Sequence, residues 1–150
     1  MKPRIVALDL GSATGYAFGC DGKVLGYGVC QFRPGRFEGG GMRFVRFSKF
    51  LEDSYEANKP DVVYFEEVRR HLGVDAAHLY GGFLAVLSQW AEAHSVPYSG
   101  VPVGTIKRHA TGKGNADKQA MIDAMAAKGF PRLDDNAADA LALLHWAFDQ

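Results

Sequence analysis

Three acidic residues occupy apolar stretches where a charge has no evident structural use. Asp9 follows the apolar residues at 5–8, Glu66 follows those at 62–65, and Asp139 lies among the alanines and leucines of 137–144. An ionised carboxylate in such surroundings is costly unless a cation or hydrogen-bond donors meet it. Hard divalent cations such as Mg²⁺ are held by a few carboxylates together with water and substrate phosphate. If the fold brings these acids together, they predict a metal site.

Each acid taken alone also has an ordinary explanation. Asp9 could cap a turn, Glu66 could be a solvated strand end, and Asp139 could pair with a neighbour on its helix. The metal site is favoured because three acids recur in apolar settings and basic segments accompany them.

A basic segment spans 105–118, where four Lys and Arg side chains face a single acid, Asp117. The basic residues are Lys107, Arg108, Lys113 and Lys118. Glycines flank Lys113, so the segment is predicted to be a flexible loop that approaches phosphates. A solvated turn explains the segment equally well.

A second basic segment, 33–49, carries five Lys and Arg side chains against Glu38, with phenylalanines between them. An aromatic platform for stacking bases is disfavoured here, because several of these phenylalanines must belong to a helix core. Arg43 and Arg46 are nevertheless expected to contact a nucleic-acid backbone. Arg69 and Arg70, just after Glu66, add further positive charge.

The elements that must position these groups follow from periodicity and breakers. The pattern predicts strands over 4–10, 14–20, 24–32, 62–65 and 97–103, and helices over 42–59, 75–94, 117–128 and 136–148. Three strands in succession followed by helix–strand repeats indicate a mixed sheet with helices on its faces.

Composition sets the limits of the function. A length of 150 residues, 47% of them hydrophobic and 23% charged, predicts a single packed domain. The charges of the 17 basic and 17 acidic side chains cancel, and this net charge of zero argues against a uniformly basic nucleic-acid binder. No apolar run approaches the ~20 residues of a membrane span, and no signal-peptide block follows the start, so no membrane association and a cytoplasmic location are expected.

The ordered set of motifs resembles the RuvC-type Holliday junction resolvases of the RNase H-like superfamily, and the match runs nearly end to end. The matching segments are ALDLGSATGYA with Asp9, YFEEV with Glu66, TIKRHATGKGNADK with Lys107 and Lys118, and NAADALALLHWA with Asp139. The short chain looks more like the phage-type members.

The resemblance implies an α/β fold over residues 1–150, with a mixed five-stranded sheet, three strands antiparallel and then two parallel, flanked by helices on both faces. It also implies a homodimeric endonuclease that cuts two opposed strands of a four-way DNA junction during recombination, repair or phage DNA processing. Two Mg²⁺ ions about 4 Å apart, replaceable by Mn²⁺, would serve the reaction. Lys118 and Lys107 would offset charge that builds on the scissile phosphate.

Two departures from the family pattern affect the site. The position three residues before the last Asp, usually an acid or a His, is Asn136, with Asp135 beside it, so either could be the fourth metal ligand. An aromatic that probes the junction in some relatives is replaced by Arg69.

With these departures, the resemblance assigns two sets of residues. The catalytic set is Asp9, Glu66, Lys107, Lys118, Asn136 and Asp139, of which Asp9, Glu66, Asn136 and Asp139 bind metal. The DNA-binding set is Arg43, Arg46, Arg69, Arg70, Lys107, Arg108, Lys113 and Lys118.

Three other classes of protein share parts of this pattern. DLGSATGYA also resembles the first phosphate loop of actin-like sugar kinases, but those need a second domain that 150 residues cannot supply. A pre-ribosomal RNA nuclease on the same fold is the nearest enzymatic rival. A catalytically silent junction-binding or RNA-binding module would keep the basic segments but has no need for Asp9 or Asp139. Metal-dependent cleavage separates the silent module from the nucleases.

Overall fold

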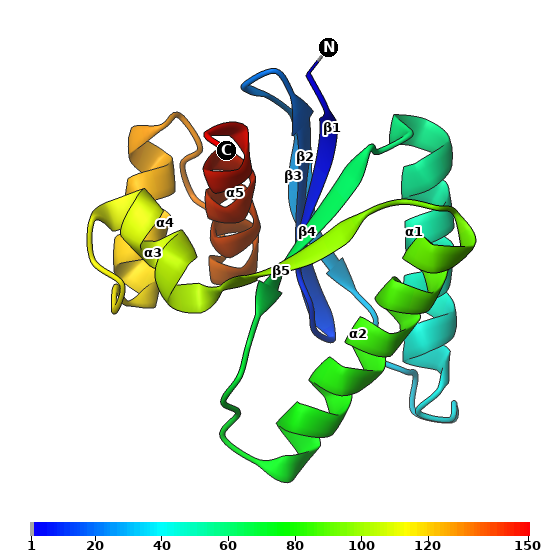
Figure 1. The fold of residues 1–150 in the computed structure, drawn as a ribbon. Helices are drawn as coiled ribbons and strands as arrows, with labels where there is room; N and C mark the ends of the chain where they lie inside the picture. The colour runs from blue at the N-terminus through cyan, green and yellow to red at the C-terminus, as the bar shows by residue number, and fades with distance from the viewer. Residues whose placement is uncertain (1) are drawn as a thin grey trace.

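A computed structural model describes residues 2–150 as one mixed sheet between two helical layers (Figure 1). The strands are β1 (Arg4–Asp9), β2 (Ala13–Cys20), β3 (Lys23–Gln31), β4 (Val62–Glu67) and β5 (Tyr98–Pro102). The helices are α1 (Met42–Asn58), α2 (Val74–Ala93), α3 (Val103–Thr111), α4 (Lys118–Ala127) and α5 (Asp135–Phe148).

The strand order is β3-β2-β1-β4-β5. The first three strands form an antiparallel meander, and β4 and β5 continue from β1 in parallel. This arrangement confirms the predicted fold class. The carboxyl ends of β1, β3, β4 and β5 therefore lie at one edge of the sheet, where chemistry-bearing residues of parallel strands converge.

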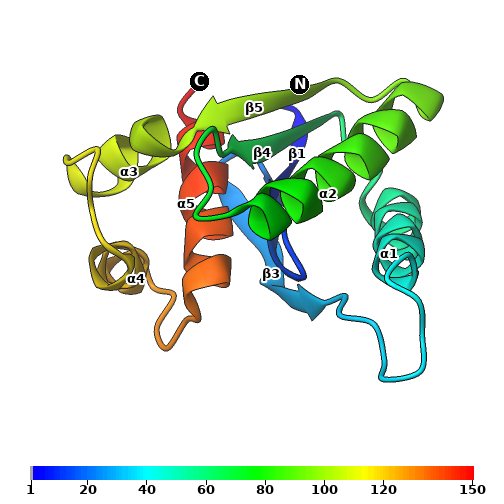
Figure 2. The ribbon, with the colours of Figure 1, turned by 90° about the horizontal axis from the view of Figure 1, so that it is seen from below.

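Two hydrophobic cores flank the sheet, one under α1 and α2 and the other under α3, α4 and α5 (Figure 2). Alternation along the strands divides their side chains between the cores. In β1, Ile5 and Ala7 face the α5 side while Val6 and Leu8 face the α1–α2 side. α5 is the most deeply buried helix, because seven of its alanines and leucines at 137–144 are each less than 5% exposed.

The prediction of a flexible loop over 105–118 is wrong for its first half, which belongs to α3. Ile106 is buried in the core and Ala110 packs against it, one turn further along the helix. Gly112, with a positive φ of 85°, ends the helix. The four basic side chains are thus spread over α3, a short turn and the first residue of α4 rather than carried on one mobile loop.

No helix within residues 2–150 is long and apolar enough to cross a membrane.

Candidate metal centre

Strand alternation and one helical turn place the three acids on the same side of the sheet. Asp9 ends β1 and continues the side of Ile5 and Ala7, which faces α5. Glu66 lies two residues after Tyr64, which packs in that same core. Asp139 lies in the second turn of α5, the helix that covers this face. Three separate elements therefore deliver carboxylates to one point.

Asp9, Glu66 and Asp139 each contribute one carboxylate oxygen to a group whose members lie within 4.8 Å of one another. Such crowding of like charges in partly buried positions disfavours their ionisation. Burial, followed by the negative charge of Glu66, raises the pKa of Asp9 well above its usual value. Burial and Glu66 likewise raise the pKa of Asp139 to about 7, although Lys107 and Lys118 oppose the increase.

This donor set fits a hard divalent cation. All of the converging atoms are carboxylate oxygens, which are the ligands that Mg²⁺ and Mn²⁺ prefer. A bound cation would also relieve the repulsion that raises the two pKa values. The alternative explanations of Asp9 and Asp139 as a turn cap and a helix-neighbour pair do not account for this convergence.

Two residues at the start of α5 are candidates for the fourth ligand. The negative charge of Asp135 contributes to the raised pKa of both Asp9 and Asp139. Asp135 also lies 3.3 Å from Nζ of Lys118. For Asn136 the structure shows a different contact, in which its backbone carbonyl packs against Gly15. Both residues stay candidates for the fourth ligand.

Gly15 lets α5 approach the sheet beside the acids, a role that the sequence analysis missed. Gly15 is paired with Asp9 across the β1–β2 ladder. A Cβ atom at Gly15 would overlap the carbonyl oxygen of Asn136 and lie within 2.5 Å of its carbonyl carbon. The preceding Thr14 is fully buried and closes the turn, because its hydroxyl donates to the Gly11 carbonyl at 2.6 Å. The signal in the sequence was the pair Thr14–Gly15 shortly after Asp9.

The two lysines predicted to be catalytic act electrostatically on one acid of the cluster. The positive charges of Lys107 from α3 and Lys118 from the start of α4 both lower the pKa of Asp139. The Lys118 side chain is 82% exposed even though it contacts Asp135. The Lys118 side chain is therefore open to solvent beside the first turn of α5.

Some of the predicted DNA-binding arginines already have carboxylate partners. Arg46 donates to both carboxylate oxygens of Glu38, at 2.8 and 2.7 Å, and Arg69 donates to Glu67 at 2.7 Å. Arg43 donates to the hydroxyl of Ser12, at 3.5 Å, in the turn that follows Asp9.

The other predicted DNA-binding positions differ in exposure. Arg70, Arg108, Lys113 and Lys118 are exposed, and Lys107 is partly buried.

Tyr80 of α2 is a second residue that the sequence analysis missed. Its hydroxyl donates to the backbone carbonyl of Glu66 at 2.8 Å and accepts from the backbone N–H of Val68 at 3.2 Å. The ring thus ties the end of β4 to α2. A tyrosine within an apolar helical stripe, shortly after a strand-end acid, was the available signal.

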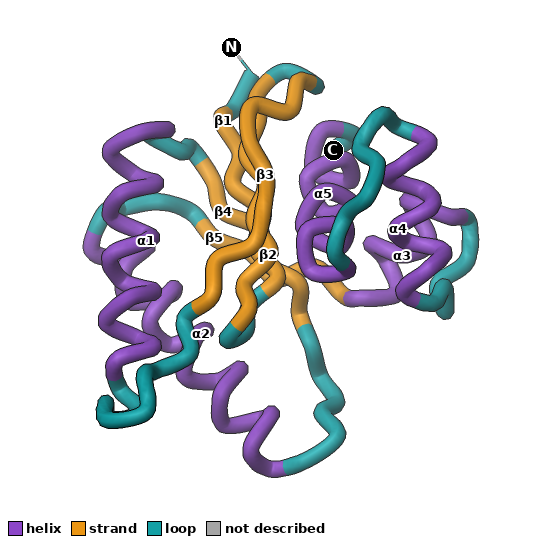
Figure 3. The backbone as a smooth tube through the Cα atoms, turned by 180° about the vertical axis from the view of Figure 1, so that it is seen from behind, coloured by secondary structure: helices purple, strands orange, loops and turns teal. Residues whose placement is uncertain are grey.

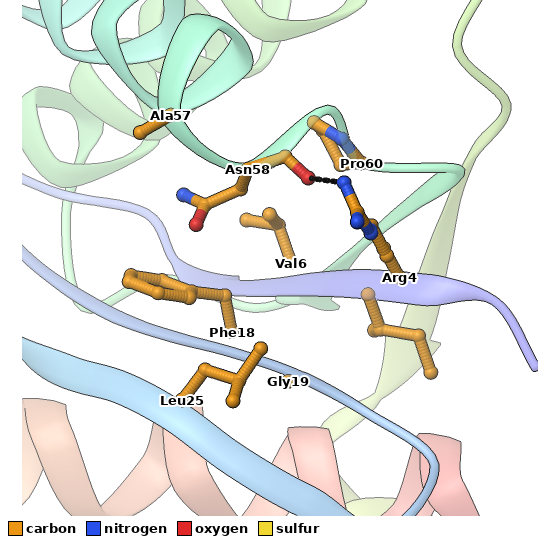
Figure 4. Close-up of a pocket in the computed structure, with 9 residues that line it drawn as sticks. Arg4, Val6, Phe18, Gly19, Leu25, Ala57, Asn58 and Pro60 are labelled. Atoms are coloured by element: carbon orange, nitrogen blue, oxygen red, sulfur yellow. Dashed lines mark hydrogen bonds between the residues drawn. The ribbon is translucent and has the colours of Figure 1, made fainter.

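A separate pocket lies near the amino end of β1, where its lining includes Arg4, Phe18, Leu25 and Asn58 (Figure 4). Arg4 donates there to the backbone carbonyl of Asn58 at 3.2 Å. Its lining contains no carboxylate, so it does not compete with the acid cluster as a metal site.

The fold of this chain, with its mixed sheet between two helical layers, is similar to that of solved Holliday junction resolvases. Among solved structures, the chain is similar to RuvC of Thermus thermophilus in complex with a Holliday junction substrate. That match has a TM-score of 0.83 at 20% identity, over 98% of this chain and 94% of that chain.

Two further solved structures share this fold. Another structure of Thermus thermophilus RuvC matches with a TM-score of 0.75 at 20% identity, over 97% of this chain and 93% of that one. The yeast mitochondrial Holliday junction resolvase Ydc2 matches with a TM-score of 0.68 at 14% identity, over 97% of this chain and 78% of that one. No protein-family model matches the sequence.

Proposed function

We propose that the chain is a divalent-metal-dependent endonuclease that resolves four-way DNA junctions. The observation that carries this proposal is the convergence of Asp9, Glu66 and Asp139 from β1, β4 and α5. A catalytically silent binding module gains nothing from three carboxylates that repel one another. In this proposal residues 1–150 act as one nuclease domain, working in the cytoplasm on recombination, repair or phage DNA.

Asp9, Glu66 and Asp139 would hold Mg²⁺, or Mn²⁺ in its place, with Asp135 or Asn136 as a further ligand. When bound, a pair of such ions would activate water and stabilise the leaving 3′ oxygen of the phosphodiester. The protein's own contribution is to fix the ligands from rigid elements and to keep them partly buried.

Lys107 and Lys118 would meet the charge that develops on the scissile phosphate. The support is that both positive charges lower the pKa of Asp139 and that the Lys118 side chain is 82% exposed. A cation held in place before the reaction stabilises the transition state without reorganising.

Two features support a branched DNA substrate: the fold, and the basic side chains that are predicted to contact phosphates. The similar Thermus thermophilus RuvC structure contains a Holliday junction. Arg43, Arg70, Arg108 and Lys113 add positive charge for phosphate contacts. A pre-ribosomal RNA nuclease on the same fold is the alternative that the substrate test must exclude.

A homodimer is proposed because two opposed strands must be cut. One side of α2 is exposed to solvent, at His78, Gly81, Ala85 and Gln89. Even so, α2 carries no Asp, Glu, Lys or Arg between Ala76 and Ala91. Depletion of charge is the compositional signal of an interface core. Pairing through α2 would give one metal centre for each of two strands.

The test is a cleavage assay with a four-way DNA junction, a duplex of the same arms and an RNA hairpin, each with and without Mg²⁺. We expect cleavage of the junction alone, at symmetric positions on two opposed strands, and only with metal. Preferential cleavage of the RNA hairpin, or metal-independent cleavage, would contradict the proposal.

A further inference from the structure

Phe37 is a large aromatic side chain that the hydrophobic core does not use. Residues 32–50 contain five phenylalanines, and the other four are buried in the core or pack against it. Phe37 is 94% exposed, in the loop between β3 and α1. Its ring is therefore open to a partner outside the chain.

The turn that carries Phe37 is held in one conformation by Glu38. The Glu38 backbone N–H donates to the Gly35 carbonyl at 3.1 Å, and the Gly35 N–H donates to Oε1 of Glu38 at 2.6 Å. Arg46 of α1 then fixes the same carboxylate with two hydrogen bonds. The backbone of the turn around Phe37 is thus tied to α1, which lowers the entropy that ordering this turn on binding would cost.

The charges around Phe37 favour a negatively charged partner. The guanidinium carbon of Arg36 lies 5.5 Å from the Phe37 ring centroid, and Arg33 is exposed two residues before the turn. Glu38 is the one acid of the segment and is neutralised by Arg46.

The loop that carries Phe37 leaves the sheet beside the metal centre. The Phe32 N–H donates to the Ser12 carbonyl at 2.7 Å, in the turn directly after Asp9. The β3–α1 and β4–α2 loops both leave the carboxyl edge of the sheet (Figure 3). The loop that carries Phe37 and the turn that follows Asp9 therefore lie at the same end of the sheet.

We propose that Phe37 stacks on an unpaired or unstacked base near the branch point of bound DNA, while Arg36 and Arg33 contact the flanking phosphates. This inference rests on the proposed function, since it concerns the same DNA. Every base offers a face for stacking, so Phe37 recognises branched structure rather than sequence. A fully stacked duplex offers no such face, which gives the interaction its selectivity.

The test measures binding in EDTA to a four-way junction that carries 2-aminopurine beside the branch point, and to a duplex of the same arms. We compare Phe37→Ala, Phe37→Trp and, as a matched control, Leu25→Ala. Leu25 is also an exposed apolar side chain, at 61%, but lies on β3 at the distant pocket (Figure 4).

Phe37→Ala should weaken junction binding about tenfold while leaving duplex binding unchanged. The wild-type chain and Phe37→Trp should quench 2-aminopurine, and Phe37→Ala should not. Leu25→Ala should match the wild type in every readout.

Equal junction affinity of Phe37→Ala and the wild type would overturn this inference, as would an equal loss on junction and duplex. A lower sedimentation coefficient for Phe37→Ala without DNA would also overturn it, by assigning Phe37 to contacts between protein copies. The proposed function is tested separately: it fails if the wild-type chain does not cut the junction in Mg²⁺.

Discussion

The carbonyl of Asn136 packs against Gly15 so closely that no other residue fits at position 15. Gly15 pairs with Asp9 in the sheet, and Asn136 begins the helix that carries Asp139. One glycine thus sets the separation between two of the three carboxylates. The geometry of the metal centre depends on this contact as much as on the acids themselves.

Gly15→Ala should push the start of α5 away from β2, with a loss of about 1–3 kcal/mol of folding stability by overpacking. It should also abolish cleavage, because Asp139 moves with the helix. Urea denaturation and a junction cleavage assay measure the two effects. Gly11→Ala is the matched control for stability, since a Cβ there meets only the Ala13 carbonyl at 3.9 Å. Equal stability of the two variants would contradict the close contact.

Asp135→Ala should weaken Mn²⁺ binding roughly tenfold, whereas Asn136→Ala should change it little. The reason is that the charge of Asp135 acts on both Asp9 and Asp139. Isothermal titration with Mn²⁺ measures both variants. A larger loss for Asn136→Ala would make the amide, not Asp135, the fourth ligand.

The metal-free protein should lose stability as pH rises from about 4 to 7. The folded-state pKa of Asp139 is about 7, against a usual 3.8, so within this window the proton leaves the unfolded chain first. Ionisation then favours unfolding. Thermal melts in EDTA should therefore show Asp139→Asn melting several degrees above the wild type at pH 8 and close to it at pH 4. If the difference in melting temperature between Asp139→Asn and the wild type is the same at pH 4 and pH 8, Asp139 is not repelled by its neighbours.

Lys118→Ala should lower the single-turnover cleavage rate about 100-fold and change junction affinity little, since the charge it meets develops in the transition state. Lys128→Ala, an exposed lysine just beyond the far end of α4, is the matched control and should leave the rate unchanged. If Lys118→Ala loses affinity and keeps the rate, Lys118 acts only as a phosphate anchor.

Arg43→Ala should reduce the salt dependence of junction binding by about 0.9 in log–log slope, the effect of one lost phosphate contact. Arg46→Ala should lower the slope less, because both of its hydrogen bonds shown here go to Glu38. Binding isotherms across a salt series compare the two. Equal slope changes would show that the Arg46–Glu38 pair opens on DNA.

The sequence predicted the sheet and the three acids because both depend on local patterns. Apolar runs marked the strands, and Asp9 and Glu66 stand out at the ends of such runs. α3 was missed because its charged residues, Lys107 and Arg108, drew the interpretation toward a loop. Its apolar side is short, and Ile106 is its one fully buried residue.

Contacts between residues far apart in the sequence could not be predicted from local sequence patterns. The spacing of Glu38 and Arg46 does not reveal their ion pair, because a loop and a helix start lie between them. The choice between Asp135 and Asn136 depends on how the first turn of α5 is rotated. That turn packs against Gly15, 121 positions before Asn136 in the chain, and local patterns do not reveal such a contact.

The most direct measurement is the single-turnover cleavage of a four-way DNA junction by the wild type and by Asp9→Asn, across a Mg²⁺ titration. Asp9→Asn removes one ligand charge and leaves the basic surface intact. We predict that it binds the junction as the wild type does and cuts at least 1000-fold more slowly, on the order of the loss of an essential catalytic group. Cutting at the wild-type rate by Asp9→Asn, with the same Mg²⁺ dependence, would contradict the carboxylate metal centre.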